Sequence, residues 1–281
     1  MIIHDMPDTE YHARSELSST GARLLLDSPA KFAYAQTHKQ APKAAYDLGT
    51  AAHTKVLGVG SGLVAYPPEH LTPSDKVSTK KETIAWAAEQ RDAGLTPVTP
   101  NEIAAVDAMV ESILANREAR ELLEQAGNSE ATVITKDMDT GVDMRARFDF
   151  LPNFTQNDPI AVDLKTSRKS ASADQFTRTV AEFGYHIQQE WYLHAYGLET
   201  GDYTMRMKFI ILETAAPYLV AVHELSEGYA QIARHEVHRA LDTYRTCTDA
   251  DLWPGYPQNM PPLEPPMWLV YQNEEEIELK L

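Results

Sequence analysis

The spacing of apolar residues changes near residue 130, and this change constrains the fold more than any other feature of the 281-residue chain. Over 101–126, apolar residues recur at the three- and four-residue spacing of an amphipathic helix. The segments 130–136 and 142–151 instead alternate apolar and polar residues around a turn-rich link, and 159–164 is a short apolar run. The pattern predicts helices, then a β-hairpin, then a buried central strand.

The remaining segments complete an α/β pattern. After the central strand the sequence predicts helices at 171–182, 184–198 and 226–246 and strands at 203–213 and 218–224. Before it the sequence predicts two short helices over 15–37, helices at 47–57 and 80–93, and a surface loop at 61–79. We therefore expect a central mixed sheet flanked by helices, with an N-terminal helical addition. The chain divides into a helical region at 1–128, a core at 129–250 and a proline-rich tail at 251–281, within one structural domain.

Two acidic residues and a lysine lie on neighbouring predicted strands. Asp149 ends one strand, and Asp163 and Lys165 lie two residues apart on the next, so they share a face while Leu164 points into the core. Paired carboxylates suit Mg²⁺ or Mn²⁺. A lysine beside them can stabilise charge on a phosphate, or help to orient and deprotonate an attacking water. The group predicts phosphodiester cleavage; the alternative is a solvated ion pair at a strand end.

Three weaker features surround this group, and each has a structural alternative. Gln188 and Tyr192 share a helix face and can flank a phosphate or a water, or simply pack. His53 lies among small residues in a helix and is a candidate metal ligand or a core histidine. Arg145 and Arg147 project from one face of a strand, where they suit a DNA backbone or a structural ion pair.

Four sequence motifs, taken together, resemble those of a known family. They are GTAAH at 49–53, RARFDFL at 145–151, VDLKTS at 162–167 and YHIQQEWY at 185–192. Their order resembles the RecE-type exonucleases, also called exonuclease VIII, which are PD-(D/E)XK nucleases with a RecB-like Q-x-x-x-Y motif. The resemblance covers roughly residues 10–200, and four motifs in order are more specific than any one of them.

The resemblance implies roles for individual residues. It implies a metal site made by His53, Asp149, Asp163 and the backbone carbonyl of Leu164, with Glu130 as a further acidic ligand. Lys165 would be the catalytic lysine, and Gln188 and Tyr192 would position the nucleophile and the scissile phosphate. Basic residues near the motifs are candidate DNA contacts: Arg145, Arg147, Arg168 and Lys169.

The resemblance also implies a function. We expect a Mg²⁺-dependent exodeoxyribonuclease, with Mn²⁺ able to substitute, that digests linear duplex DNA from an end in the 5′ to 3′ direction. Such enzymes are typically ring-shaped homo-oligomers that deliver single-stranded tails to an annealing protein, which points to a role in phage-type recombination.

Charge and cysteine content narrow the alternatives. Asp and Glu number 41 against 25 Lys and Arg, which gives a net charge of −16. This charge argues against a surface that coats itself with nucleic acid non-specifically but is compatible with a local basic channel. The single cysteine, Cys247, excludes an intramolecular disulfide and a cysteine-held iron–sulfur cluster. A CRISPR-associated iron–sulfur nuclease, which shares the motifs but needs four cysteines, is therefore excluded.

Several other expectations follow from what the sequence lacks. It has no apolar stretch of membrane-spanning length and no secretory leader pattern, so we expect a cytoplasmic protein without membrane contact. It has no P-loop, so we expect no use of ATP. His235 and His238 are a second candidate metal pair, or an exposed helix surface. A structure-specific endonuclease and a non-catalytic DNA-end-binding module are the alternative functions.

Overall fold

The computed structural model describes residues 1–38, 44–59, 62–153 and 159–278. Its main feature is a six-stranded mixed sheet in the order β1-β4-β5-β6-β7-β8. The strands are β1 (Ile2–Ile3), β4 (Gly127–Lys136), β5 (Asp143–Pro152), β6 (Ile160–Ser167), β7 (Arg206–Glu213) and β8 (Val220–Glu224). Neighbouring strands are antiparallel except for β6 and β7, which are parallel. Parallel strands need a crossover, and two helices between them supply it.

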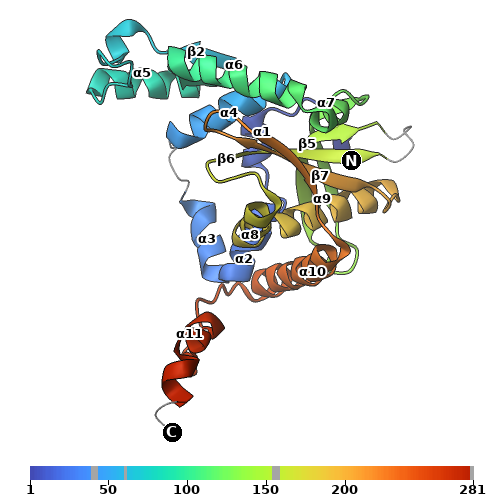
Figure 1. The fold of residues 1–281 in the computed structure, drawn as a ribbon. Coiled ribbons are helices and arrows are strands. Elements are labelled where there is room, and N and C mark those ends of the chain that lie inside the picture. Colours follow the sequence, from blue (N-terminus) through green and yellow to red (C-terminus); the bar gives the residue numbers. More distant parts are fainter. Residues whose placement is uncertain (39–43, 60–61, 154–158, 279–281) are drawn as a thin grey trace.

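Helices cover both faces of this sheet (Figure 1). One layer contains α4 (Ala44–Leu57), α6 (Pro100–Ala115) and α7 (Arg117–Leu123). The other contains α2 (Ser19–Asp27), α3 (Pro29–Thr37), α8 (Ala173–Phe183), α9 (Tyr185–Thr200) and α10 (Glu227–Ala250). Each layer buries its own apolar cluster against the sheet, the larger one beneath α9 and α10. The predicted α/β class, with a mixed central sheet flanked by helices, is confirmed.

The helix predicted over 101–126 is two helices. Asn116 separates α6 from α7, and its side chain accepts a hydrogen bond from the backbone N–H of Ala119. An asparagine that offers its oxygen to free backbone donors favours a new helix start over a continuous helix. The apolar spacing continues across this break, which is why periodicity alone misplaced it.

The segment 61–79 is not simply a surface loop. It contains β2 (Gly62–Ala65) and the 3₁₀ turn η1 (Pro68–His70), and β2 pairs in parallel with β3 (Leu95–Val98). The crossover between these strands is α5 (Lys81–Asp92), close to the predicted helix. Four-residue strands are too short to show an alternation of apolar and polar residues. The helix α1 (Asp8–Ala13), with fewer than two turns, is likewise too short to show a helical period.

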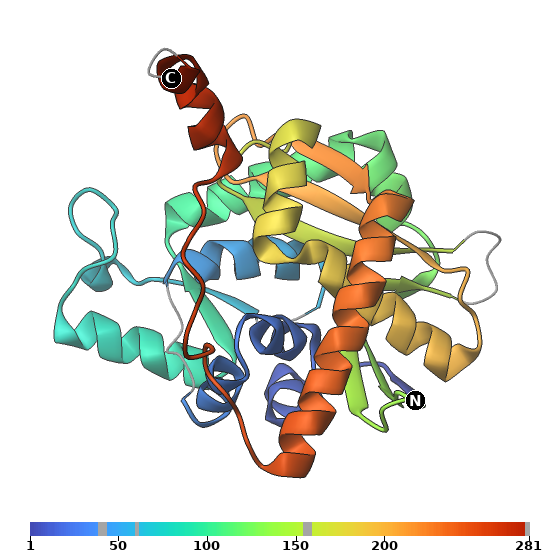
Figure 2. The same cartoon turned by 90° about the horizontal axis from the view of Figure 1, so that it is seen from below.

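The C-terminal tail leaves the body of the molecule. Trp253 packs against Phe32 and Tyr244, and beyond it an extended proline-rich stretch leads to α11 (Met267–Glu278). This last helix projects away from both layers in two perpendicular views (Figures 1 and 2). Within the described ranges, no helix combines the length and the apolar character that crossing a lipid bilayer requires.

Candidate active site

The candidate site lies where two central strands separate. In the described part of the chain, β5 and β6 share one residue pair, Phe150 with Val162. Because the strands are antiparallel, the next pair in register would be Asp149 and Asp163. Both aspartates therefore stand at the mouth of the gap between the strands. The backbone N–H of Leu164, which has no ladder partner on β5, donates to Asp149 Oδ2 over 2.7 Å.

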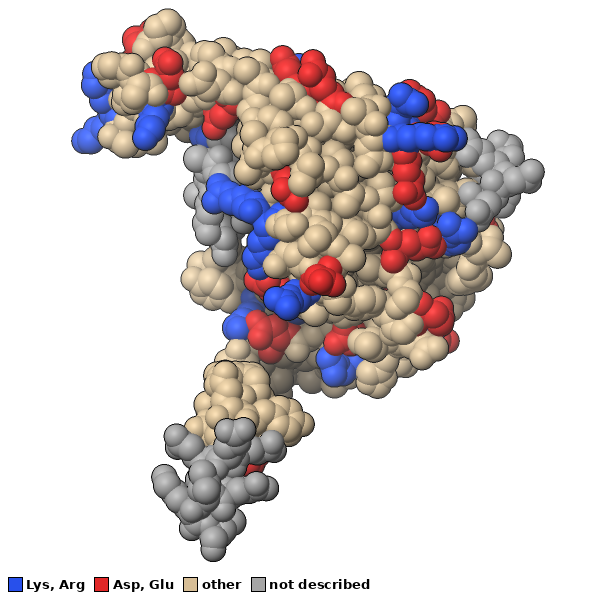
Figure 3. Space-filling view, in the orientation of Figure 1, with Lys and Arg blue, Asp and Glu red and all other residues tan. Residues whose placement is uncertain are grey.

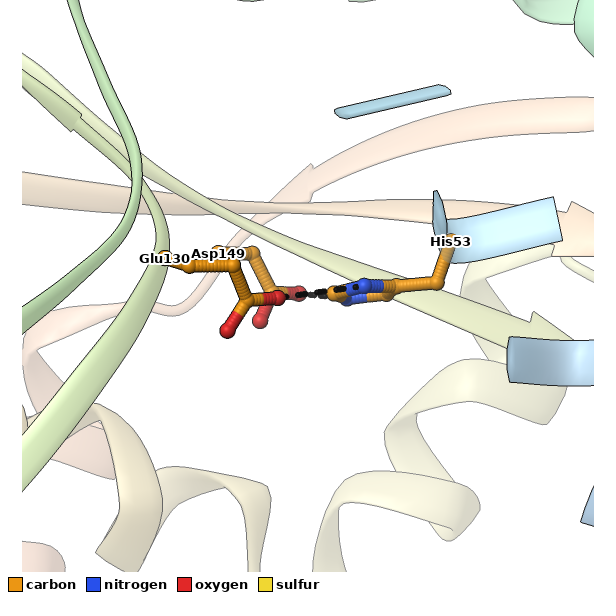
Figure 4. A group of neighbouring side chains, drawn as sticks. All are labelled: His53, Glu130 and Asp149. Atoms are coloured by element: carbon orange, nitrogen blue, oxygen red, sulfur yellow. Dashed lines mark ion pairs between the residues drawn. The ribbon is translucent and has the colours of Figure 1, made fainter. Parts of the chain in front are cut away.

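Three side chains gather on the α4 side of this gap (Figure 4). His53, on α4, lies with Nε2 2.9 Å from Asp149 Oδ2 and Nδ1 3.4 Å from Glu130 Oε1. Glu130 faces Asp149 across β4 and β5, between two regular pairs of the ladder. Its φ of 54° is left-handed and interrupts the pairing at that point. One ligand atom from each of the three residues lies within 4.8 Å of the others.

The ionisation of this trio reflects its crowding. Burial opposes the charged imidazole, but the charge and hydrogen bond of Asp149 outweigh it and raise the pKa of His53 to about 9. Burial and the neighbouring charge of Asp149 raise the pKa of Glu130 to about 7. The pKa of Asp149 is lowered, because His53 and Lys165 outweigh the effect of its burial. The raised pKa favours the protonated form of His53, whose ring lies between the carboxylates of Asp149 and Glu130.

Asp163 lies on the opposite, α9 side of the gap. It is fully buried, and its Oδ1 accepts a hydrogen bond of 2.5 Å from Gln188 Nε2. Its Oδ2 lies 2.6 Å from Lys165 Nζ, without hydrogen-bond geometry. The prediction that Asp163 and Lys165 project together is confirmed, and Leu164 is buried in the cluster under α4.

Asp163 and Lys165 shift each other's ionisation. Burial raises the pKa of Asp163 to about 6; Lys165 opposes the rise and Asp149 adds to it. The pKa of Lys165 is raised, because the two aspartates outweigh the burial of its ammonium group. Lys165 is therefore a cation near neutral pH. This state favours the stabilisation of phosphate charge over the deprotonation of a water.

The two residues of the Q-x-x-x-Y motif, Gln188 and Tyr192, both lie on α9 but make different contacts. Gln188 reaches Asp163, whereas the buried Tyr192 packs against Phe148, with ring centroids 5.1 Å apart, and its hydroxyl hydrogen-bonds with Ser19. Burial raises the pKa of Tyr192 well above its ordinary value. Trp191 is fully buried, as expected of a core residue. Gln188 thus contacts the acidic group directly, and Tyr192 supports the helix that carries it.

The two arginines of β5 make internal contacts. Arg147 is 8% exposed, donates to Thr132 Oγ1 and to the carbonyl of Met6, and pairs with Asp8. Arg145 donates to the carbonyl of Arg14, and both guanidinium groups lie over the ring of Tyr11. These contacts favour a structural role for Arg145 and Arg147 over contact with a DNA backbone.

Arg168 and Lys169 follow the end of β6 and line a cavity of about 380 Å³ that Lys165 also reaches. The other candidate metal pair, His235 and His238, is exposed on α10, where His238 pairs with Asp242. Among the described residues, neither histidine belongs to a group of three close metal-ligating side chains.

The donor set at the gap fits a divalent cation. Two carboxylates and an imidazole offer the oxygen and nitrogen ligands that Mn²⁺ and Mg²⁺ accept. The carboxylates are crowded: burial first, and then the charge of Asp149, raises the pKa of Glu130 to about 7. Sequence reasoning named Glu130 only as an additional ligand, whereas the geometry groups it with His53 and Asp149.

The split mixed sheet, with two carboxylates and a lysine at the gap, defines a PD-(D/E)XK-like fold. A family model described as "PDDEXK-like domain of unknown function (DUF3799)" matches residues 18–260, and the chain belongs to this family. No curated protein shows a significant sequence match.

A solved structure supports the fold. The chain is similar to a proposed exonuclease from Eubacterium rectale, with a TM-score of 0.61 and 12% identity over 94% of this chain and 96% of the other. The structure of LHK-Exo in complex with dAMP matches with a TM-score of 0.25 and 15% identity, over 74% of this chain and 96% of that one.

Proposed function

We propose that the protein is a metal-dependent deoxyribonuclease that hydrolyses duplex DNA from an end. One observation carries the proposal: Asp149 and Asp163 lie on neighbouring strands where β5 and β6 part, and Lys165 Nζ lies 2.6 Å from Asp163 Oδ2. Family membership supports the nuclease assignment. The fold shared with a proposed exonuclease, together with the resemblance to RecE-type motifs, supports end-directed digestion.

The geometry suggests how the residues divide the work. His53, Glu130 and Asp149 would hold a divalent cation, and the cation would supply Lewis-acid stabilisation. Lys165 places its ammonium group where charge develops on the phosphate. Asp163 holds Lys165 in place, and Gln188 fixes the carboxylate of Asp163.

The finer features of the proposal rest on the resemblance. We include Mg²⁺ as the cation, 5′ to 3′ polarity, a ring-shaped homo-oligomer and delivery of single-stranded tails to an annealing protein. A role in phage-type recombination in the host cytoplasm completes the proposal.

The test uses linear duplex DNA labelled at one 5′ end, with closed circular DNA beside it and Mg²⁺ or Mn²⁺ present. We expect early release of labelled mononucleotide from the linear substrate and an intact circle. Lys165→Ala should lower the rate by about a hundredfold or more. Release of label only at the end of digestion would contradict the 5′ to 3′ polarity.

Two other outcomes would replace the proposal. Cutting of the circle would establish an endonuclease, which the same carboxylates and lysine would serve. DNA binding without cleavage in either metal would indicate an end-binding module.

A further inference from the structure

A row of two stacked aromatic rings with a lysine at each end leads outward from Lys165. Lys165 Nζ lies 5.0 Å from the ring centroid of Tyr185, and the rings of Tyr185 and Phe183 stack with centroids 5.8 Å apart. Lys169 Nζ lies 5.9 Å from the centroid of Phe183. The row therefore connects the candidate catalytic lysine with the molecular surface.

This row forms one wall of the cavity of about 380 Å³ between β6, α8 and α4. Phe176 and Thr179 lie on the same face of α8 as Phe183 and are buried. Phe183 is 48% exposed and lines the cavity. Its side chain is therefore partly accessible from the cavity.

The cavity is also lined by an arginine, Arg168, that has no acidic partner among the described residues. Arg168 lines it and makes no ion pair or hydrogen bond within the described ranges, although the chain as a whole is strongly acidic. Lys169 pairs with Glu182 at 2.7 Å, and both side chains are about half exposed. Figure 3 shows Lys and Arg side chains at the surface where β6 leads into α8.

From these observations we infer that the cavity binds an unpaired nucleotide of the DNA strand next to the scissile phosphate. Its base would stack on Phe183, and Arg168 would contact its phosphate. Aromatic faces beside a positive groove are how proteins hold single-stranded nucleic acid without reading its sequence. A cavity of this size suits one nucleotide better than a duplex, whose paired and stacked bases cannot reach the ring.

The inference deepens the proposed nuclease function and rests on it for the role of the bound strand. It predicts that the duplex frays at the site and that single-stranded or frayed ends bind better than blunt ends. The stacking surface would act on substrate binding, because it lies outward from Lys165 and does not touch the carboxylates.

The test compares Phe183→Leu, Phe183→Trp and wild type. A single-stranded oligonucleotide that carries 2-aminopurine is titrated without a divalent metal, and its fluorescence quenching and affinity are measured. We expect Phe183→Leu to weaken binding about tenfold and to lose most of the quenching, and Phe183→Trp to restore both. With cleavable duplex, Phe183→Leu should raise KM with kcat within about twofold.

Matched charge variants test the phosphate contact. Arg178 lies on the exposed face of α8 away from the cavity and serves as the control. Arg168→Ala should weaken single-strand binding and reduce the salt dependence by about one phosphate contact, whereas Arg178→Ala should leave both unchanged. Equal effects of the two variants would overturn the assignment of Arg168.

The outcomes separate the two proposals. If wild type cleaves DNA and Phe183→Leu binds and cleaves like wild type, the stacking site is wrong and the nuclease stands. If wild type does not cleave but quenching depends on Phe183, the binding site stands and the nuclease fails. Selective loss of blunt-duplex binding in Phe183→Leu would overturn the assignment to an unpaired strand.

Discussion

At the scale of single residues, the positions of the candidate catalytic side chains depend on neighbouring side chains that contact them. Asp163 is buried and aligned by the amide of Gln188, and the Asp163 carboxylate in turn holds Lys165. The i, i+4 spacing of Gln188 and Tyr192 predicted one shared face but not that only the glutamine would reach a carboxylate. That outcome depends on how α9 packs on the sheet, which the spacing does not encode.

Removing the amide of Gln188 tests this support. Gln188→Ala should lower the cleavage rate by about 10- to 100-fold, because outer contacts that orient a ligand typically contribute that much. The rate on labelled linear duplex is the measurement. Gln231→Ala, on the exposed surface of α10, is the matched control, and an equal loss there would contradict a specific role.

The ionisation of His53 predicts a pH dependence of stability. Its folded-state pKa of about 9 lies above the ordinary value of 6.5, so the folded state binds this proton more tightly. The stabilisation is complete below about pH 6.5 and is lost as the pH rises toward 9. In EDTA, the melting temperature should therefore fall over this range in wild type.

His53→Ala should lack that part of the decline, since it has no imidazole to titrate. The exposed His235→Ala, measured by thermal denaturation across the same pH range, should retain it. Parallel curves for wild type and His53→Ala would show that the His53 pKa is ordinary.

At the scale of elements, long periodic segments were predictable and local interruptions were not. The hairpin, the central strand and the last long helix follow from spacing and were placed within a few residues. The break at Asn116, the short strand β3 and the projecting α11 have no periodic signature. The break depends on a helix cap, β3 depends on pairing with β2, and most of the described side chains of α11 are exposed. The left-handed backbone of Glu130 is likewise invisible in a sequence that there reads as a regular strand.

The backbone of Glu130 predicts an unusual order of stabilities. Glu130→Gly should be more stable than Glu130→Ala by about 1 kcal/mol, because a left-handed conformation costs an L-residue roughly that amount and costs glycine nothing. Chemical denaturation measures the difference. At neighbouring Ala131, in regular strand geometry, glycine should instead lower the free energy of unfolding.

At the scale of the whole molecule, the tail separates into a packed part and a projecting part. Trp253 belongs to the body through its contacts with Phe32 and Tyr244, whereas Leu263 and Trp268 are largely exposed. The tail is therefore not one functional unit, although the sequence shows a single proline-rich segment.

Two truncations test this division. Ending the chain after Gln258 should leave the melting temperature within a few degrees of wild type, since Met260, Leu263 and Trp268 beyond it are largely exposed. Ending it after Asp251 should lower the melting temperature markedly, because it removes the indole packed on α3 and α10. Differential scanning calorimetry measures the melting temperatures of both truncated proteins. An equal fall in the two melting temperatures would contradict the division of the tail into a packed and a projecting part.

The residues around the gap between β5 and β6 come from both sides of the predicted boundary at residue 128. His53 comes from a helix that precedes the core in the sequence, and Gln188 comes from a helix on the other face of the sheet. The division at residue 128 is therefore a boundary of sequence pattern and not of chemistry. Residues 1–128 supply His53, whereas residues 129–250 supply the carboxylates, Lys165 and Gln188, so exchanging either segment alone would replace one side of the contacts between His53 and Asp149.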